Sequence, residues 1–295
     1  ALIGPIAAAT TRIRVGSGGV MLPHYSPFKV AETFTILAAL FPGRIDLGIG
    51  RAAGTDPITT FALQRDRRQA SPDDFPQQLA ELLAYLDDSL PEDHPFHRLA
   101  ATLPGLPGLP EPWLLGSSPQ SAIWAGQLGL PYAFADFINP GGAEIAALYR
   151  ERYTPARETP LPRTAVAAWV LCAPTDEEAQ HLATSSRMTL TLLRRGRLIP
   201  VPTPQQATEF LRREGKLSPD GGNGSPPGRR GIIGRPEKVR AELEQLATEY
   251  GADEAIVVTI THDHGARRRS YELLADAFGL EPAGSGTPAP AEAEA

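Results

Sequence analysis

The stretch IRVGSGGVMLP, from Ile13 to Pro23, begins as a β-branched run, passes through three glycines in four positions and stops at a proline. Glycine weakens the interior of a strand because it has no side chain to pack and loses more backbone entropy than other residues. Glycines 16, 18 and 19 at the end of a strand therefore predict a bulge, or a place where a flat or large ligand lies against bare backbone. Whether a cis peptide bond accompanies the bulge at Gly18-Gly19 is left open by the sequence.

Strand and helix patterns alternate along almost the whole chain. Strands are expected near 13–20, 44–49, 112–116, 131–135, 165–172 and 254–260, and helices near 27–40, 75–88, 119–128, 141–152, 176–195, 236–250 and 266–278. This alternation predicts an α/β fold with a parallel sheet, either doubly wound or a (β/α)8 TIM barrel. The opening ALIGPIAAAT resembles the apolar end of a helix. With six expected strands, two strands and a helix ahead of Ala1 would complete the eight of such a barrel, and we expect these elements to be missing from the chain.

The composition narrows the classes of function. The 295 residues are 42% hydrophobic, and 34 acidic against 28 basic residues give a net charge of −6, which does not favour nucleic-acid binding. The single cysteine, Cys172, excludes an internal disulfide and a cysteine-rich metal site. No apolar run approaches the ~20 residues of a membrane helix and no signal peptide is recognisable, so a cytoplasmic protein without membrane partners is expected.

Two segments differ in composition from the rest. Residues 196–230 are rich in proline, glycine and polar side chains, although 204–214 could form a short helix. A loop of this length in a compact domain is typical of a functional or disordered segment, and we expect a mobile lid here. Residues 281–295 are of low complexity and are expected to be a disordered tail.

The sequence GRIDLGIGRAAGTD places a permanent cation, Arg51, at the carboxyl end of a strand. Gly48, Gly50 and Gly54 are spaced one residue too widely for the dinucleotide-binding fingerprint, and no helix follows at once. Arg51 is the more informative residue, because α/β folds place their ligands at the carboxyl ends of strands. The alternative is a surface arginine paired with an acid.

A second motif, PWLLGSSPQSAIWAGQLGLP, combines features of an anion site. A strand ends at Gly116, Ser118 precedes a proline suited to the first helical position, and Ser121 stands in the first turn. Hydroxyl groups and the free N–H groups of a helix start bind anions. The alternative is an ordinary serine cap, but together with Arg51 the motif predicts phosphate binding.

The histidines give weaker indications. His24 follows the glycine-rich strand and could reach a ligand there. His262 and His264 are two residues apart without a third ligand of suitable spacing, so no metal site is expected. Neither a G-x-S-x-G elbow nor a Ser-His-Asp order is present, so no sequence motif supports hydrolase chemistry.

Taken in order, these segments resemble the luciferase-like flavin-dependent monooxygenase family, the barrel enzymes related to bacterial luciferase. The resemblance runs from residue 1 to about 280 and rests on GSGGVMLPHYSPFKVAE, FPGRIDLGIGRAAGTD, WLLGSSPQSAIWAGQLGLPYAFA and GADEAIVVTITHDHGARRRSYELLADAF. It implies one barrel domain over residues 1–280, with the segment 196–230 as the lid between the seventh and eighth barrel strands.

The resemblance also implies roles for particular residues. Arg51 matches the family's phosphate-binding arginine, and Ser118 and Ser121 match the hydroxyls that hold the same phosphate. Gly18 and Gly19 match the bulge of the third barrel strand, against which the flavin ring packs. These five residues are the expected FMN-binding residues of this chain.

The implied activity is that of a monooxygenase in which reduced FMN (FMNH2), supplied by a separate flavin reductase, reacts with O2 and a small organic substrate is oxidised. Gly50 stands where luciferase has a reactive cysteine, so that thiol is absent. The family's catalytic histidine lies in a run that would precede Ala1, which leaves His24 as the candidate in this chain. The alternatives are an F420-dependent hydride-transfer enzyme and a truncated, non-catalytic flavin-binding protein. A Rossmann dehydrogenase has less support. Whether the protein forms a homodimer is left open.

Overall fold

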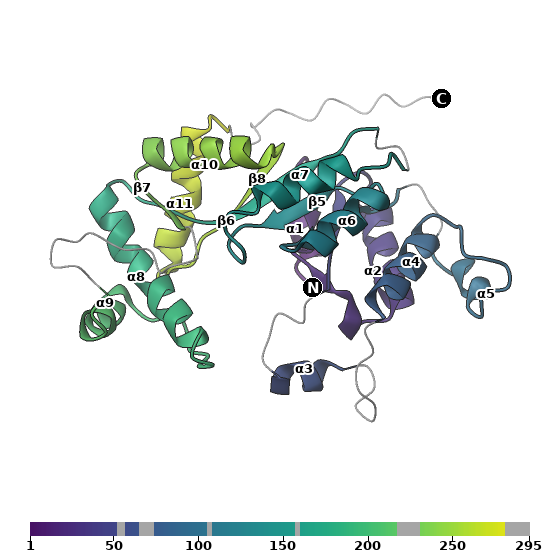
Figure 1. The fold of residues 1–295 in the computed structure, drawn as a ribbon, viewed down its shortest axis with the longest axis horizontal. Helices are drawn as coiled ribbons and strands as arrows, with labels where there is room; N and C mark the ends of the chain where they lie inside the picture. The colour runs from purple at the N-terminus through teal and green to yellow at the C-terminus, as the bar shows by residue number, and fades with distance from the viewer. Residues whose placement is uncertain (52–56, 65–73, 105–107, 157–159, 217–230, 281–295) are drawn as a thin grey trace. The chain divides into compact units, whose positions relative to one another are not determined.

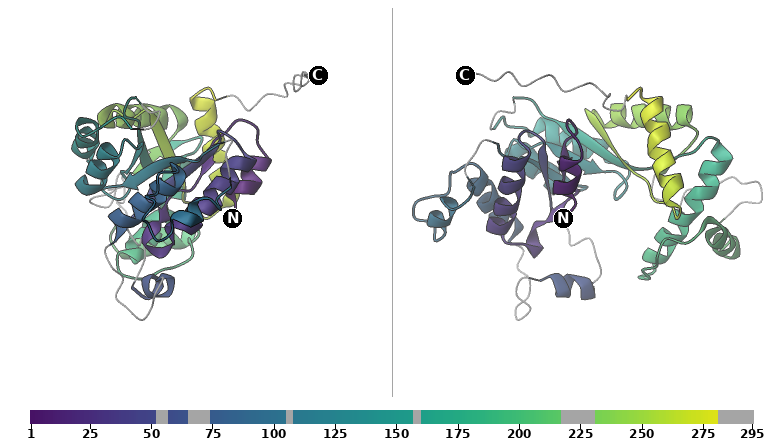
Figure 2. Two further views of the ribbon diagram at one scale, coloured as in Figure 1. Left: turned by 90° about the vertical axis from the view of Figure 1, so that its right-hand side faces the viewer. Right: turned by 180° about the vertical axis from the view of Figure 1, so that it is seen from behind.

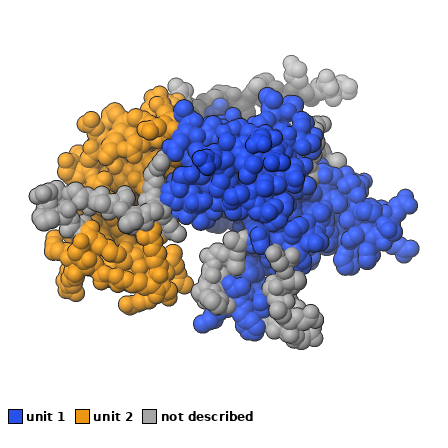
Figure 3. Space-filling model, viewed as in Figure 1, with its two compact units in different colours: residues 1–167, 247–256 blue, residues 168–246, 257–295 orange. Residues whose placement is uncertain are grey.

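The computed structural model describes residues 1–295 apart from 52–56, 65–73, 105–107, 157–159, 217–230 and 281–295 (Figure 1). The described residues fall into two compact units, which are distinguished by colour in Figure 3. Unit 1 comprises residues 1–167 and 247–256, and unit 2 comprises residues 168–246 and the described part of 257–295. Among the described helices, none combines the length and the apolar character needed to cross a membrane.

Unit 1 contains the amino-terminal elements. Its helices and strands are α1 (Ile3–Ala8), β1 (Val15–Gly16), β2 (Val20–Met21), the 3-10 helix η1 (Leu22–His24), α2 (Pro27–Leu40), β3 (Ile45–Gly50), α3 (Pro57–Leu63), α4 (Phe75–Leu86), α5 (His97–Ala100), β4 (Glu111–Gly116), α6 (Pro119–Gln127), β5 (Tyr132–Ala135) and α7 (Ala143–Glu151).

Unit 2 contains most of the remaining elements. They are α8 (Asp176–Leu193), α9 (Pro204–Arg213), β7 (Gly231–Gly234) and α11 (His264–Ala277). Strand β6 (Thr164–Cys172), helix α10 (Pro236–Tyr250) and strand β8 (Glu254–Val258) each have residues in both units.

Neighbouring strands pair in parallel. In unit 1, β1 and β2 pair with β3, β3 with β4, β4 with β5, and β5 with the first half of β6, a path that can be followed from the purple strands to the teal β5 in Figures 1 and 2. In unit 2, the second half of β6 pairs with β7. Strand β6 reads TAVAAWVLC and is buried over nearly all its length, as expected for a parallel strand covered on both faces. The expected α/β fold with parallel strands and intervening helices is therefore present.

The glycine-rich stretch forms a β-bulge. Gly16 lies opposite Asp46 and Val20 lies opposite Ile49, so three residues of one strand, 17–19, face two of the other, 47 and 48. One extra residue in one strand is the defining feature of a bulge, and it bends the strand. The bulge expected at Gly18-Gly19 is confirmed, and every peptide bond among the described residues is trans.

Buried aromatic residues hold the carboxyl end of β5. The rings of Tyr132 and Tyr149 are 5.3 Å apart, and those of Phe134 and Tyr250 are 5.2 Å apart. The Tyr250 hydroxyl donates to Asp136 Oδ1 over 2.7 Å, so a buried hydrogen bond fixes Asp136, the residue that follows β5. This packing sets the position of one wall of the cavity described below.

A group of charged residues lies at the amino ends of the unit 1 strands. Arg14 pairs with Asp46 at 2.5 Å and with Glu111 at 3.0 Å, and Arg163 pairs with Glu111 and, at 3.3 Å, with Glu254. We call these five residues the amino-end ion network. Its members satisfy one another, so this end of the strands presents no isolated charge among them.

Some elements differ from the sequence expectation. Strand β7 was not expected, because GIIG offers only two apolar residues between glycines and too short a run for a periodic pattern. Helices α3 and α5 are also additional, and short helices depend on tertiary contacts rather than on local propensity.

The segment 196–230 is in part a packed structure. Helix α9 begins with a capping box at Thr203 and buries Ala207 and Leu211, and it packs on α8. The short helix considered for 204–214 is therefore present, because amphipathic residues within the polar composition suffice to anchor it. Residues 217–230 and the expected tail 281–295 lie outside the described residues, and mobility of the segment remains a prediction.

Candidate functional site

A cavity of about 600 Å³ lies in unit 1 at the carboxyl ends of four parallel strands. Its lining comes from the ends of β2, β3, β4 and β5 and from side chains of helices α4 and α6. In α/β folds with parallel strands, ligands bind at this end of the sheet. A volume of this size lies within the range of small-molecule and cofactor sites.

One side of the cavity is bare backbone. Gly18, Gly19 and Gly50 all line it. A Cβ added at Gly18 or Gly50 would meet no heavy atom within 4 Å, and at Gly19 the nearest atom would be Leu115 Cδ2 at 3.6 Å. Open space therefore stands in front of all three glycines. Gly19 has a φ of +136°, a conformation that only glycine adopts readily, so the bulge itself requires this residue.

The cation of the site lies beside an aromatic wall. Arg51 directly follows β3 and lines the cavity, with its guanidinium carbon 5.7 Å from the centroid of the Trp124 ring. The Trp124 ring in turn lies 5.4 Å from that of Phe75, which is almost wholly buried. A cation within about 6 Å of a tryptophan face is attracted by the ring quadrupole, which orients the arginine without neutralising its charge.

Helix α6 begins at the cavity with a serine cap. Ser118 is its N-cap and Pro119 its first residue, and Ser118 Oγ accepts from the backbone N–H of Ser121 over 3.3 Å. A Cβ at Gly116 would lie 2.2 Å from Ser121 Oγ, so the glycine at the end of β4 allows the helix to start this close to the strand. The free N–H groups of the first turn and the positive end of the helix dipole therefore point toward the cavity rim.

The two serines have different surroundings. Ser121 Oγ donates to Ser118 O over 2.7 Å and lies 2.9 Å from the hydroxyl of Tyr132. Burial raises the pKa of Tyr132 to about 12, so this phenol is protonated at neutral pH and donates to Ser121. The Ser121 hydroxyl is thus engaged within the protein, whereas Ser118 is exposed and has the hydroxyl that can turn toward a ligand.

The fold brings the five expected FMN-binding residues to one cavity. Its lining includes Gly18, Gly19, Arg51, Ser118 and Ser121, together with Gly50, although up to about 100 residues separate them in the chain. Sequence reasoning did not single out Phe75, Trp124 or Tyr132. Their place at the site depends on how α4, α6 and β5 pack, for which no local sequence signal exists.

The histidines contribute less. His24 lies in η1, after β2, and is not among the residues that line the cavity; its Nε2 is buried without a hydrogen-bond partner in the described structure. His262 Nδ1 is 2.8 Å from Val201 O, and His264 opens α11. In the part of the chain that the structure describes, no three His, Cys, Asp or Glu side chains are grouped so that they could hold a metal ion.

Sequence comparisons show which known proteins this chain resembles. The family described as luciferase-like monooxygenase matches residues 1–289. Three relatives illustrate the likeness, each aligned over at least 93% of this chain. Protein YwcH of Bacillus subtilis (strain 168) is 44% identical over 94% of this chain and 82% of its own length. A luciferase-like monooxygenase of Escherichia coli (strain K12) is 38% identical over 93% of this chain and 79% of its own length. The N-acetyl-S-alkylcysteine monooxygenase of Bacillus subtilis (strain 168) is 36% identical over 94% and 81%.

Solved structures show the same fold. The apo form of MsnO8 superimposes with a TM-score of 0.82 at 42% identity, covering 95% of this chain and 82% of that chain. The oxygenating constituent of 3,6-diketocamphane monooxygenase of Pseudomonas putida, in complex with FMN, gives a TM-score of 0.62 at 22% identity. The match covers 92% of this chain and 80% of that chain. The F420-dependent tetrahydromethanopterin reductase of Methanopyrus kandleri gives a TM-score of 0.59 at 15% identity, covering 94% of this chain and 85% of that chain. The expected α/β fold of the luciferase-like barrel type is thereby confirmed.

Proposed function

Since the chain belongs to the luciferase-like monooxygenase family, we propose that it binds reduced FMN in the unit 1 cavity and uses it with O2 to oxidise a small organic substrate. One observation carries the proposal. A single cavity combines a bare-backbone wall, a permanent cation and the start of a helix, which are the three features that a flavin ring and its phosphate require.

The phosphate end of FMN fits the rim between β3 and α6. Arg51 supplies a positive charge, and its planar fork suits two phosphate oxygens. Ser118 contributes a hydroxyl, and the first turn of α6 contributes backbone N–H groups. Ser121 and Tyr132 then act as positioning residues, because their hydrogen bonds hold the start of the helix in place.

The ring end of FMN fits the glycine wall. The space in front of Gly18 and Gly50 is empty, and a planar ring stacked there would replace side chains that the sequence leaves out. Leu115 and Phe75 extend this wall with apolar side chains. Apolar side chains beside a reactive group limit its contact with water and thereby limit side reactions.

When bound, reduced FMN supplies the electrons with which O2 oxidises a substrate, and a separate flavin reductase would provide it. The contribution of this chain is to bind the phosphate at Arg51 and Ser118, to orient the ring along the glycines, and to exclude water with the aromatic wall. We propose no residue as a proton donor, since His24 does not line the cavity.

The proposal is tested by titrating the purified protein with FMN and, anaerobically, with FMNH2. Loss of one charge-assisted contact costs about 1.5–3 kcal/mol, so Arg51→Ala should bind FMN about 10- to 100-fold more weakly. Arg213→Ala is the matched control, because Arg213 is an exposed arginine of unit 2 paired with Glu209. Equal affinity of the Arg51→Ala and wild-type proteins would contradict the assignment.

Two further outcomes separate the alternatives. Binding of F420 without binding of FMN would replace the proposal with a hydride-transfer enzyme of the same fold. Tight binding of FMN without formation of an oxygenated product from FMNH2 and O2, across a panel of small thioethers and ketones, would favour a non-catalytic flavin-binding protein.

A further inference from the structure

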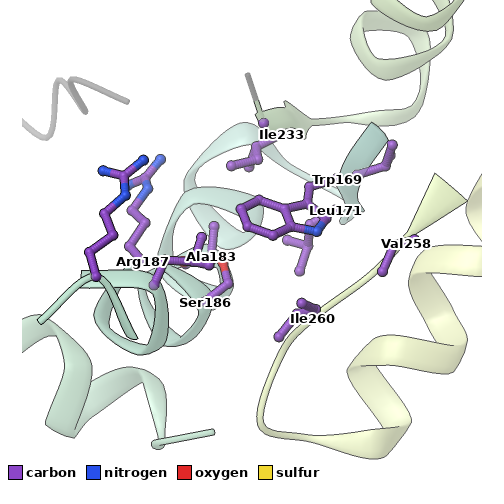
Figure 4. A pocket seen from close by; sticks show the side chains of 12 residues that line it. Trp169, Leu171, Ala183, Ser186, Arg187, Ile233, Val258 and Ile260 are labelled. Carbon is purple, nitrogen blue, oxygen red and sulfur yellow. The ribbon is translucent and has the colours of Figure 1, made fainter. Parts of the chain in front are cut away.

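Unit 2 contains a pocket that the proposed function does not use (Figure 4). It lies between helix α8 and the ends of β6, β7 and β8, and Figure 4 shows Trp169, Ile233, Val258 and Ile260 across from Ser186 and Arg187 of the helix. The inner volume of about 40 Å³ leaves room for about three water-sized groups. A pocket of this size suits one end of a small molecule.

The unusual residue of this pocket is Arg187. Its relative exposure is only 8%, so the side chain is more than nine-tenths buried. Its Nη2 donates to Gln180 Oε1 over 2.6 Å, a neutral partner. Its Nη1 is buried with no hydrogen-bond acceptor, and among the described residues no carboxylate forms an ion pair with the guanidinium.

This arrangement is energetically incomplete. A guanidinium stays protonated under ordinary conditions, so it cannot escape burial by losing its charge. Burial lowers the pKa of Arg187, and no opposite charge from the described part of the chain acts against that effect. A buried cation without an anion is costly, because the lost hydration is not replaced. Within the described structure, the pocket therefore lacks the negative charge that would complement Arg187.

The rest of the lining agrees with a missing anion. Arg194 adds a second guanidinium to the pocket wall, and none of the described residues that line the pocket is acidic. Ser186 Oγ donates to Ala183 O over 2.9 Å, so its hydroxyl is engaged within the helix. Apart from the arginines and Ser186, the side chains of the described wall are apolar and include the Trp169 ring.

We propose that this pocket binds a small organic acid, with its carboxylate on Arg187 and its first carbons against Trp169 and Ile233. The guanidinium fork matches the two oxygens of a carboxylate, and inorganic anions would lack the apolar contacts. The proposal does not depend on flavin, because every residue that it uses belongs to unit 2.

The test is a titration of the ¹⁵N-labelled full chain with sodium butyrate, followed by two-dimensional NMR of the tryptophan indole N–H groups. Trp169→Phe assigns the signal of Trp169 among the three tryptophans of the chain. We expect a saturable shift of that signal with butyrate and at least 10-fold weaker effects of 1-butanol and sodium chloride. The Arg187→Met protein should lose at least 10-fold in butyrate affinity, and Arg187→Lys should lose less.

Two controls keep the result interpretable. Arg213→Met should bind butyrate as the wild type does. Ser186→Phe leaves Arg187 in place but fills the pocket, and it should abolish the shift. Without butyrate, Arg187→Met should melt at the same temperature as the wild type or higher, because an uncompensated charge has been replaced by an apolar group. Equal responses to butyrate and butanol, unchanged butyrate affinity in both Arg187→Met and Ser186→Phe, or a shift that never saturates would overturn the proposal.

Discussion

The glycine wall of the unit 1 cavity offers a substitution that separates ligand binding from folding. Gly18→Val adds three carbons where an added Cβ meets nothing within 4 Å, and the φ of Gly18 is not in the left-handed region. Replacing glycine at a compatible position stabilises a fold by about 0.4–1 kcal/mol, through the unfolded chain. The side chain would instead occupy the place of the flavin ring. Overpacking of that kind costs about 1–3 kcal/mol, which corresponds to about 5- to 150-fold weaker FMN binding.

Gly48 provides the matched contrast within the adjacent strand. A Cβ there would lie 2.3 Å from Ser17 O, a backbone atom, and 3.0 Å from Leu115 Cδ1. Gly48→Ala should therefore destabilise the protein by about 1–3 kcal/mol and lower Tm by roughly 2–12 °C. Gly19→Val is less informative than Gly18→Val, since a φ of +136° adds backbone strain to any loss of binding.

The assay pairs calorimetric titration with FMN and thermal unfolding of each protein alone. Gly18→Val should keep or raise Tm while losing FMN affinity, and Gly48→Ala should lower Tm. If Gly18→Val instead lowers Tm as Gly48→Ala does and binds FMN like the wild type, the open space at Gly18 is not the place of the ring.

Three further predictions follow from the contacts described above. Ser118→Ala should weaken FMN about 10-fold while leaving the affinity for riboflavin, which has no phosphate, unchanged. Ser118→Ala and Ser121→Ala should each lower the free energy of unfolding by about 0.5–1.5 kcal/mol, as measured with urea, because both hydroxyls belong to the capping box of α6. Burial raises the pKa of Cys172 to about 11 and that of Tyr132 to about 12. The unfolded values are about 8.5 and 10, so the stability that these two neutral side chains contribute is fully present below about pH 8.5 and is lost as the pH rises toward 11. Urea midpoints measured from pH 8 to 11 should show this decline, and Cys172→Ala should make it shallower. Glu111→Gln should cost about 1 kcal/mol in 50 mM salt and less in 1 M salt, because the amino-end ion network is partly exposed to solvent.

Residues at strand ends and helix starts could be anticipated because their chemistry is local. A cation directly after a strand, such as Arg51, and a serine before a proline, such as Ser118, are set by neighbours in the chain. Parallel strands then bring their carboxyl ends to one edge, so residues far apart in sequence meet without any detailed knowledge of packing. The bulge could be anticipated for the same reason, since its signal is a run of glycines.

Features that depend on packing could not be anticipated. Trp124 and Phe75 reach the cavity only because α4 and α6 lie against each other, and the aromatic residues of a helix otherwise predict ordinary core. Arg187 stands in SSRMTLTLLRRGR beside other arginines, where composition indicates a solvated face. Its burial results from the strands that cover α8, and no periodic pattern marks it.

The bulge of residues 17–19 also separates two registers within one strand. Val15 is held opposite Ile45 and Val20 opposite Ile49, and each pairing is independent of how many residues lie between them. Removing one residue from 17–19 would leave two residues facing two, a regular ladder in which both pairings persist. The length of this short stretch can therefore change by one residue without disturbing the surrounding core, and each change alters the shape of the cavity. Among homologous chains we expect single-residue insertions and deletions to be tolerated here, at a position inside a strand where they are ordinarily excluded.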